Sequence, residues 1–292
     1  MSSGAPVTTG LVGGVARVTL NRPGKRNALD RATIALLSAE LRRCALDPAV
    51  RVVQITGAGG VFCAGADLTE MQAQAQASES ANLADADQLA SMLALLDSMP
   101  KPTLARVNGD GYGGALGLLA ACDIAVAADD AKFAFTEVRL GIIPAVVSPF
   151  VLGKIGESAA RRYFLTAETL TAATLKKLGL VHEVVPGVEL DACCTRITDA
   201  LLRAAPNALA EAKTLISDVA AGTRGTAGPG GITGPGGITV PGGTTDSGGA
   251  ATKRAAASHE AAARLARLRI QPEAQEGFNA FFAKRKANWR AD

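Results

Sequence analysis

The chain has 292 residues, of which 48% are hydrophobic and 20% charged, a balance typical of a folded protein with a sizeable core. A formal net charge of +3 is too small to indicate a nucleic-acid partner, although it suits an anionic ligand if basic side chains gather at one place. Five cysteines without a C-x-x-C pair, and two distant histidines, support neither a disulfide framework nor a metal site. We therefore expect a reduced, intracellular protein without a bound metal.

The first ten residues lack the basic residues and the apolar core of a signal peptide. The most apolar stretches, residues 111–128 and 140–153, are interrupted by Asp123 or by Pro144 and Pro149, which disfavours a membrane span. These features predict a cytoplasmic protein that has no membrane partner.

The first predicted elements are a strand, a helix and a second strand. Residues 15–20 alternate between inward and outward positions, as in a half-buried strand. Asp30 is a suitable N-cap for an amphipathic helix over residues 31–46, and the β-branched run at residues 50–56 is long enough only for a buried strand. A strand, a helix and a strand in this order indicate a parallel crossover.

The same alternation continues further along the chain. The predicted elements are a helix marked by Leu83, Leu89, Leu93 and Leu96, a strand at 103–107, a helix at 113–121, a strand at 123–128, a helix from the Thr171 cap to Gly179, and a strand at 180–185. The pattern therefore predicts an α/β protein.

After about residue 205 the strand signals stop, and helices are predicted at 207–219, 251–270 and 273–287. We therefore divide the chain into a core at 1–205 and a C-terminal helical region at 206–292. A Gly/Pro/Thr-rich insert at 222–249, with a repeated Pro-Gly-Gly hexapeptide, interrupts the helical region. Ordering a glycine-rich backbone has a high entropic cost, so we predict a flexible loop, with a tether or partner-binding strand as the alternative.

Three segments carry candidate chemistry. Residues 62–68 read Phe-Cys-Ala-Gly-Ala-Asp-Leu and follow a strand-like run, whereas residues 108–115 read Asn-Gly-Asp-Gly-Tyr-Gly-Gly-Ala and open a helix-like run. Each can present an unpaired backbone N–H to a reacting oxygen. The third segment places Glu137 after a strand predicted at 133–136. Two such N–H groups beside a carboxylate would form an oxyanion hole with an acid–base group.

These segments resemble the signature of the crotonase (enoyl-CoA hydratase/isomerase) superfamily, whose members stabilise a thioester enolate between two backbone N–H groups. The resemblance extends to residues 21–29, 140–144 and 284–289, in family order over most of the chain. It implies a ββα spiral core and a C-terminal helical region that packs against neighbouring subunits. We therefore expect a homotrimer or a dimer of trimers.

By this resemblance, Ala66 and Gly114 match the two oxyanion positions, and Glu137 matches the glutamate that moves protons beside the thioester. Apolar neighbours such as Phe135 and Ile142 would raise the pKa of the Glu137 carboxyl, so that it can act as both acid and base. As an isolated glutamate it would be read as surface charge, and the motif is what singles it out.

Gly117 departs from the pattern of two-glutamate hydratases, which carry a second glutamate three residues after the second oxyanion glycine. Single-glutamate members include enoyl-CoA isomerases and bacterial methylglutaconyl-CoA-type hydratases, and residues 133–149 look more like the second group. We predict a hydratase of 2-enoyl-CoA thioesters, with Gly117 leaving room for a branched acyl group such as 3-methylglutaconyl. The alternatives are a 3-enoyl-CoA isomerase and a non-catalytic acyl-CoA-binding scaffold.

The substrate would itself bring coenzyme A, so no separate cofactor is expected. Lys25 and Arg26 border the CoA mouth by resemblance, although either could instead be ordinary surface charge. The remaining positions that the resemblance assigns to substrate are the backbone of Ala28, Ala64 and Leu68 along the acyl and adenine channel, and Phe281 and Lys284 facing a neighbouring subunit's CoA.

Overall fold

The computed structural model describes residues 4–223, 231–233, 239–241 and 261–290. The chain divides into two compact units, Met1–Arg203 and Ala204–Asp292. The first unit contains two β-sheets and most of the helices, and it carries every predicted oxyanion and acid–base residue. In the part of the chain that the structure describes, no helix combines the length and the apolar character needed to cross a membrane.

The larger sheet of the first unit has six strands in the order β1-β2-β3-β5-β7-β10. β1 and β2 are antiparallel, and every later neighbouring pair is parallel. The strands are β1 (Val7–Val12), β2 (Val15–Leu20), β3 (Val52–Gly57), β5 (Thr103–Val107), β7 (Ile124–Ala128) and β10 (Glu183–Val185). Parallel strands need crossovers, which the helices of this unit supply.

Those helices follow the capping signals in the sequence. The Asp30 side chain accepts a hydrogen bond from the Thr33 N–H at 2.7 Å, and Gly179 ends a later helix with φ 83°. The helices are α1 (Arg31–Leu46), α2 (Leu68–Gln74), α3 (Glu79–Asp97), α4 (Gly114–Ala121), α5 (Ser148–Thr166), α6 (Ala172–Leu178) and α7 (Leu190–Arg203), with 3-10 turns η1 (Pro23–Lys25), η2 (Glu137–Leu140) and η3 (Gly187–Glu189).

A second, smaller sheet runs in the order β4-β6-β8-β9. Its strands are β4 (Val61–Cys63), β6 (Asp110–Tyr112), β8 (Lys132–Ala134) and β9 (Leu170–Thr171). Each of β3, β5 and β7 in the larger sheet is followed by a short strand of the smaller sheet and then by a helix. The repeated ββα unit therefore winds between two sheets, as a spiral does, and does not form one doubly wound sheet.

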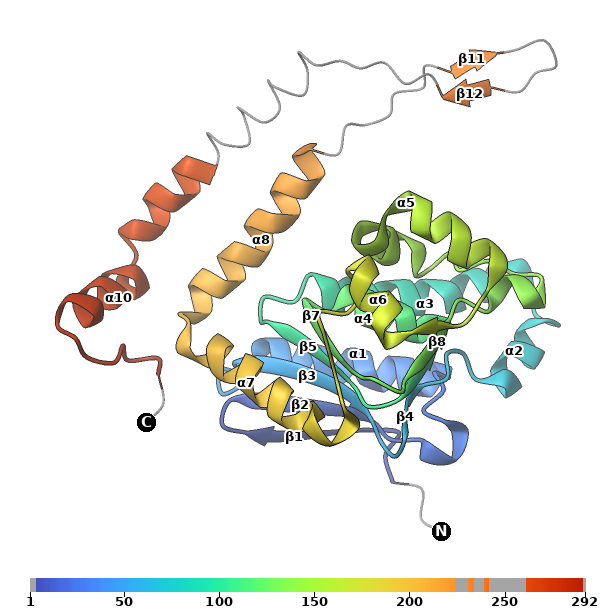
Figure 1. Ribbon diagram of the computed structural model, residues 1–292, viewed down its shortest axis with the longest axis horizontal. Coiled ribbons are helices and arrows are strands. Elements are labelled where there is room, and N and C mark those ends of the chain that lie inside the picture. The colour runs from blue at the N-terminus through green and yellow to red at the C-terminus, as the bar shows by residue number, and fades with distance from the viewer. Residues whose placement is uncertain (1–3, 224–230, 234–238, 242–260, 291–292) are drawn as a thin grey trace. The chain divides into compact units, whose positions relative to one another are not determined.

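Helices cover both faces of the larger sheet (Figure 1). On one face, Leu104 and Val126 pack against Leu190, Cys193 and Cys194 of α7. The other face packs against α1, α3 and α4 in the main core. Burial on both faces explains why β7 reads as a continuous apolar run and why every residue of β3 is buried.

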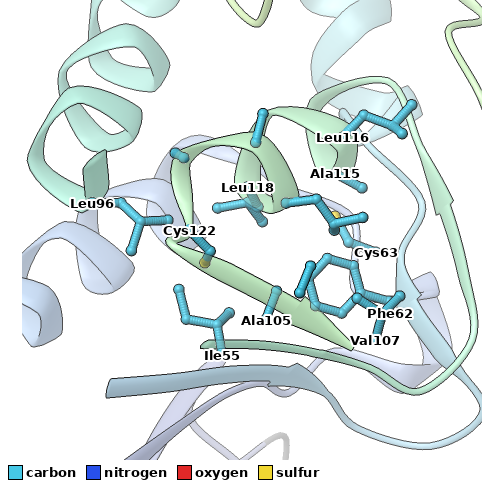
Figure 2. Close-up of a cluster of buried hydrophobic side chains, with 14 of the residues drawn as sticks. Ile55, Phe62, Cys63, Leu96, Ala105, Val107, Ala115, Leu116, Leu118 and Cys122 are labelled. Carbon is cyan, nitrogen blue, oxygen red and sulfur yellow. The ribbon is translucent and has the colours of Figure 1, made fainter. Parts of the chain in front are cut away.

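Helix α4 is anchored in that main core. Figure 2 shows its Ala115 and Leu118 above the ring of Phe62, which lies beside Val107. The side chains of these four residues are fully buried. Close packing on this scale holds the start of α4 at a fixed place relative to β4 and β5.

The second unit contains α8 (Pro206–Thr223), a helix over residues 261–269 and α10 (Pro272–Phe282). The helix predicted at 273–287 is too long at its C-terminal end. Lys284 has φ 53°, and Arg285 folds back to make two hydrogen bonds of 2.7 Å with the Glu276 carboxylate. A left-handed residue cannot continue an α-helix, so α10 stops before it.

The predicted insert at 222–249 lies mostly outside the described residues, as does the 251–260 part of the predicted second helix. Within the insert, β11 (Gly231–Thr233) and β12 (Thr239–Pro241) form an antiparallel pair. Gly231 and Pro241, which are paired in this ribbon, belong to the first and third of the repeated Pro-Gly-Gly segments.

Candidate active site

Three neighbouring strands of the smaller sheet bring the candidate residues to one edge. β4, β6 and β8 are parallel to their neighbours, so their carboxyl ends lie at the same side of the sheet. Ala66 follows β4, Gly114 follows β6 and Glu137 follows β8. The topology therefore predicts that the three residues meet, and the contacts below show how closely.

The loop after β4 has its backbone N–H groups hydrogen-bonded at every residue from 64 to 67 except Ala66. Ala64 N–H donates to the Arg26 carbonyl at 2.9 Å, and Gly65 N–H donates to the Cys63 sulfur at 3.4 Å. Asp67 N–H donates to the Leu29 carbonyl at 3.0 Å. Ala66 is exposed, and within the described residues its N–H has no hydrogen-bond partner, so it is available to a ligand.

A parallel bridge between Leu29 and Ala66 explains this orientation. Leu29 N–H donates to the Gly65 carbonyl at 2.7 Å, and its own carbonyl accepts from Asp67. As is usual in a parallel pair, Leu29 forms both of its backbone hydrogen bonds with the residues before and after Ala66 and none with Ala66 itself. The N–H of Ala66 itself is consequently turned away from Leu29.

The second N–H group lies at the start of α4. Gly113 N–H donates to the Ala134 carbonyl at 3.0 Å, whereas Gly114 is the first helical residue and its N–H has no intrahelical acceptor. A Cβ on Gly65 would lie 2.6 Å from the Tyr112 carbonyl oxygen and 3.7 Å from the Gly114 nitrogen. The two loops therefore touch, and only glycine at position 65, which also has φ 84°, permits this approach.

The Glu137 carboxyl lies directly against the second loop. A Cβ on Gly113 would be 3.1 Å from Glu137 Oε1, while Oε2 is buried and has no hydrogen-bond partner in the described structure. Burial raises the pKa of Glu137 above its ordinary value, and a hydrogen bond from its own backbone N–H offsets this only in part. A half-buried carboxyl whose pKa is raised, and which has one unpaired oxygen, can both accept and donate a proton.

The space beside Gly117 is not open, which corrects the expectation that Gly117 leaves room for an acyl branch. A Cβ on Gly117 would lie 2.6 Å from Val147 Cγ1 and 3.0 Å from Leu93 Cδ1. Both Val147 and Gly117 are buried. The volume that a second glutamate would need is therefore filled by the side chain of Val147.

The residues assigned to CoA along the first unit lie on two adjoining segments. Ala28 is buried and Leu68 is exposed, and the Arg26 carbonyl is bonded to Ala64 as described above. Lys25 is exposed, whereas the Arg26 guanidinium pairs with Asp110 at 3.3 Å and lies 5.8 Å from the centre of the Tyr112 ring. Arg26 is therefore already engaged within the chain.

Phe281 and Lys284 belong to the second unit. The Phe281 ring is 77% exposed and meets the Phe282 ring edge-on, with ring centres 5.5 Å apart. Lys284 is exposed and follows the end of α10.

Sequence reasoning missed the side chains that surround the two N–H groups. A Cβ on Gly114 would meet Leu29 Cδ1 at 3.7 Å and Leu89 Cδ2 at 3.9 Å. Arg22 and Asp67 form an ion pair of 2.8 Å next to Ala66. Arg22 lies in the motif at 21–29 and Asp67 in the motif at 62–68. Opposite charges in two motifs that the fold brings together could have revealed this ion pair.

The fold and the site define a class of α/β protein in which two touching loops each present a backbone N–H, and a half-buried carboxyl lies against the second loop. Such a site can stabilise a negative oxygen and move a proton next to it.

Comparison with known proteins agrees with this class. Residues 11–227 match the Enoyl-CoA hydratase/isomerase family. The chain is 36% identical to the 2,3-dehydroadipyl-CoA hydratase of Escherichia coli over 200 residues, which are 68% of this chain and 76% of the relative. It is 35% identical to the hydroxycinnamoyl-CoA hydratase-lyase of Pseudomonas fluorescens over 203 residues, which are 68% of this chain and 74% of the relative.

Among solved structures, an enoyl-CoA hydratase from Shewanella pealeana aligns with a TM-score of 0.83 and 36% identity, covering 97% of this chain and 96% of the other. The chain belongs to the enoyl-CoA hydratase/isomerase family, and its fold is the crotonase fold. The resemblance inferred from the three motifs is thereby confirmed at the level of the superfamily.

Proposed function

We propose that the protein adds water to the double bond of a 2-enoyl-CoA thioester, with Glu137 as the acid–base group and the N–H groups of Ala66 and Gly114 as the oxyanion hole. The observation that carries the proposal is the buried Glu137 Oε2, which has no hydrogen-bond partner in the described structure and belongs to a carboxyl that lies against the Gly113–Gly114 turn. A buried polar atom without a partner is costly, so its retention points to a ligand that supplies one.

In the proposed reaction, Glu137 accepts a proton from water as the oxygen of that water bonds to the β-carbon. The electron pair of the double bond moves to the thioester, which becomes an enolate with its negative charge on the oxygen. Two N–H donors stabilise this charge, and removing one such donor typically costs about 3 to 4 kcal/mol. Glu137 then returns its proton to the α-carbon, which leaves a 3-hydroxyacyl-CoA and the original carboxylate.

A branched substrate such as 3-methylglutaconyl-CoA is the acyl group that we favour. This choice rests on the resemblance of residues 133–149 to methylglutaconyl-CoA-type hydratases, because the filled space at Gly117 gives it no support.

Isomerisation of a 3-enoyl-CoA to a 2-enoyl-CoA is the second candidate, and the single carboxyl favours it. Glu137 would remove a proton from the α-carbon and deliver it to the γ-carbon through the same enolate, without a second group to hold water. Val147 supplies apolar surface where two-glutamate hydratases have that second group.

We also propose that the chain assembles as a trimer or a dimer of trimers. Large apolar side chains of the second unit are exposed, including Ile216, Ile270, Phe281 and Phe282, at 69% to 78%. Exposed apolar surface of this kind is typical of a subunit interface.

The test is a panel of CoA thioesters that contains crotonyl-CoA, 3-methylglutaconyl-CoA and 3-hexenoyl-CoA, with products separated by chromatography. We expect hydration of the 2-enoyl thioesters, with the highest kcat/KM for the branched one. Double-bond migration without detectable hydration would replace the proposal with the isomerase. Absence of any turnover by the wild-type protein would indicate a non-catalytic scaffold that binds acyl-CoA.

The variant Glu137→Gln is the control for this panel. An amide cannot accept the proton, so we expect kcat to fall by about 100- to 10,000-fold for every thioester that the wild-type protein converts. Unchanged turnover would show that Glu137 takes no part in the reaction.

A further inference from the structure

Arg22 ties together the two segments that flank the Ala66 N–H. Its Nη2 donates to Asp67 Oδ2 at 2.8 Å and lies 2.9 Å from Asp30 Oδ2. Its Nη1 donates to the Ala28 carbonyl at 2.7 Å. One guanidinium therefore joins the residue after Ala66 to the residues on both sides of Leu29.

Both carboxylates bound by Arg22 are also helix N-caps. Asp30 accepts from the Thr33 N–H at the start of α1, and Asp67 accepts from the Thr69 N–H at 2.9 Å at the start of α2. Each carboxylate therefore uses one oxygen for its helix and the other for Arg22. The ends of two helices are fixed to one shared cation.

The cluster is shielded from solvent. Asp67 is 4% exposed and the Arg22 side chain 18% exposed. The backbone of Arg22 is fixed as well, because its N–H donates to Asn27 Oδ1 at 2.9 Å. The Asn27 side-chain amide in turn donates to the carbonyls of Ala58 and Val61. A largely buried cluster that is held by this many hydrogen bonds has little freedom to move.

We propose that Arg22 and Asp67 are positioning residues that hold the Ala66 N–H at the angle needed to bind the enolate oxygen. The Ala66 N–H belongs to the Gly65–Ala66 peptide, whose carbonyl accepts from the Leu29 N–H, and the next peptide donates through the Asp67 N–H to the Leu29 carbonyl. Arg22 holds Asp67 and both neighbours of Leu29 in place, so loss of the Arg22–Asp67 bond would let the Gly65–Ala66 peptide rotate. The inference rests on the proposed function, since it assigns a role within the same oxyanion hole. Neither residue contacts the reacting atoms, and each acts through the backbone of residue 66.

The variant Asp67→Asn tests this role. Asparagine keeps an acceptor for the Thr69 N–H, so the α2 cap remains, but the charged bond to Arg22 is lost. We expect kcat to fall by about 10- to 100-fold with KM changed by less than about threefold, because a misplaced donor weakens transition-state binding more than substrate binding. Arg22→Gln should have the same effect, and the double variant should lose little more than either single variant.

Asp191→Asn is the matched control. Asp191 on α7 pairs with Arg106 at 2.9 Å and Arg17 at 3.2 Å, on the face of the larger sheet that α7 covers. We expect this variant and Asp67→Asn both to lower Tm, but only Asp67→Asn to lower kcat. Equal losses of kcat in the two variants, or a loss in Asp67→Asn confined to Tm, would overturn the proposal.

A ligand measurement separates this inference from the proposed reaction. Acetoacetyl-CoA forms an enolate with its own ultraviolet absorbance, and butyryl-CoA binds without forming one. We expect wild-type protein to raise the enolate absorbance and Asp67→Asn to raise it by at least about threefold less, with equal butyryl-CoA affinity. If the wild-type protein converts no enoyl-CoA but shows this difference, the reaction is wrong and the positioning role stands. If the absorbance is equal in both proteins, or absent from the wild-type protein, the positioning role is wrong.

Discussion

The carboxyl of Glu137 is held where ionisation is unfavourable. Burial raises its folded pKa above the unfolded value, so its protonated form is the one that the fold favours. The stabilising contribution is therefore complete below the unfolded pKa of about 4.3 and is lost as pH rises through the folded pKa. A base of this kind also loses its ionised form at a higher pH than an ordinary glutamate does.

Glu137→Gln should therefore become more stable relative to the wild-type protein as pH rises. We expect Tm values that nearly coincide at about pH 4 and a higher Tm for the variant at neutral pH, since glutamine carries no charge. Differential scanning calorimetry over this range measures the difference. Glu157→Gln, which changes a 74% exposed partner of Arg161, serves as the control and should shift stability by less than about 0.5 kcal/mol at every pH. A Tm difference that is the same at all pH values would contradict the prediction.

Gly117 and Val147 form a matched small and large pair. Replacing glycine by alanine inside a helix usually stabilises a protein by about 0.5 to 1 kcal/mol. Here the new Cβ would meet the stiff, buried Val147 side chain at 2.6 Å, so Gly117→Ala should destabilise the protein by about 1 to 3 kcal/mol.

Val147→Ala should relieve that clash. Urea denaturation of both single variants and the double variant should therefore give a double-variant loss smaller than the sum by about 0.5 to 3 kcal/mol. Gly10→Ala is the control, because a Cβ there meets nothing within 4 Å. If the losses in unfolding free energy of the two single variants simply add in the double variant, positions 117 and 147 do not compete for the same space.

Among the elements, those with strong local signals were predictable. The Asp30 cap and the apolar spacing gave α1 its bounds, and the strands at residues 15–20 and 103–107 also have the predicted bounds. Helix α5 was not predicted, because no side chain caps its N-terminus and Gly156 inside it has φ 73°, which breaks the apolar period.

The short strands β4, β6, β8 and β9 span only two or three residues each, too few for an alternating pattern. Three of them, β4, β6 and β8, nevertheless place the candidate site. The strand predicted at 133–136 overlaps β8 at residues 133 and 134 only. For the candidate site, the motifs singled out Ala66, Gly114 and Glu137. The Arg22–Asp67 pair joins residues 45 positions apart, and local periodicity carries no signal across that distance. The filling of the Gly117 space by Val147 was hidden for the same reason.

The N-cap of α6 offers a test at this scale. Thr171 Oγ1 accepts from the Thr174 N–H at 3.1 Å, so Thr171→Ala should cost about 1 kcal/mol and Thr171→Ser should restore most of that loss. Urea denaturation measures both. Thr169→Ala removes an exposed threonine that caps no helix and should change stability by less than about 0.5 kcal/mol. Equal losses at 169 and 171 would show that the cap is not the cause.

At the scale of the whole molecule, the proposed assembly makes the second unit an interface. A chain of 29.6 kDa should elute with three or six times that mass in light scattering. Placing charges on its exposed apolar side chains, as in the double variant Ile216→Glu and Phe282→Glu, should lower that mass to one chain, because burying a carboxylate against apolar surface is unfavourable.

Leu46→Glu is the control for this experiment. Leu46 is 85% exposed at the end of α1 in the first unit, and the same charge there should leave the mass unchanged. A wild-type protein that elutes as a single chain would contradict the proposed assembly.

The contact between Gly117 and Val147 also determines in which order these two positions can change during evolution. A lineage that acquired a carboxylate at position 117 would first have to shorten the residue at 147, because the reverse order passes through an overcrowded and less stable intermediate. A second carboxylate at this site therefore takes at least two substitutions in this chain, and shortening residue 147 first avoids the less stable intermediate.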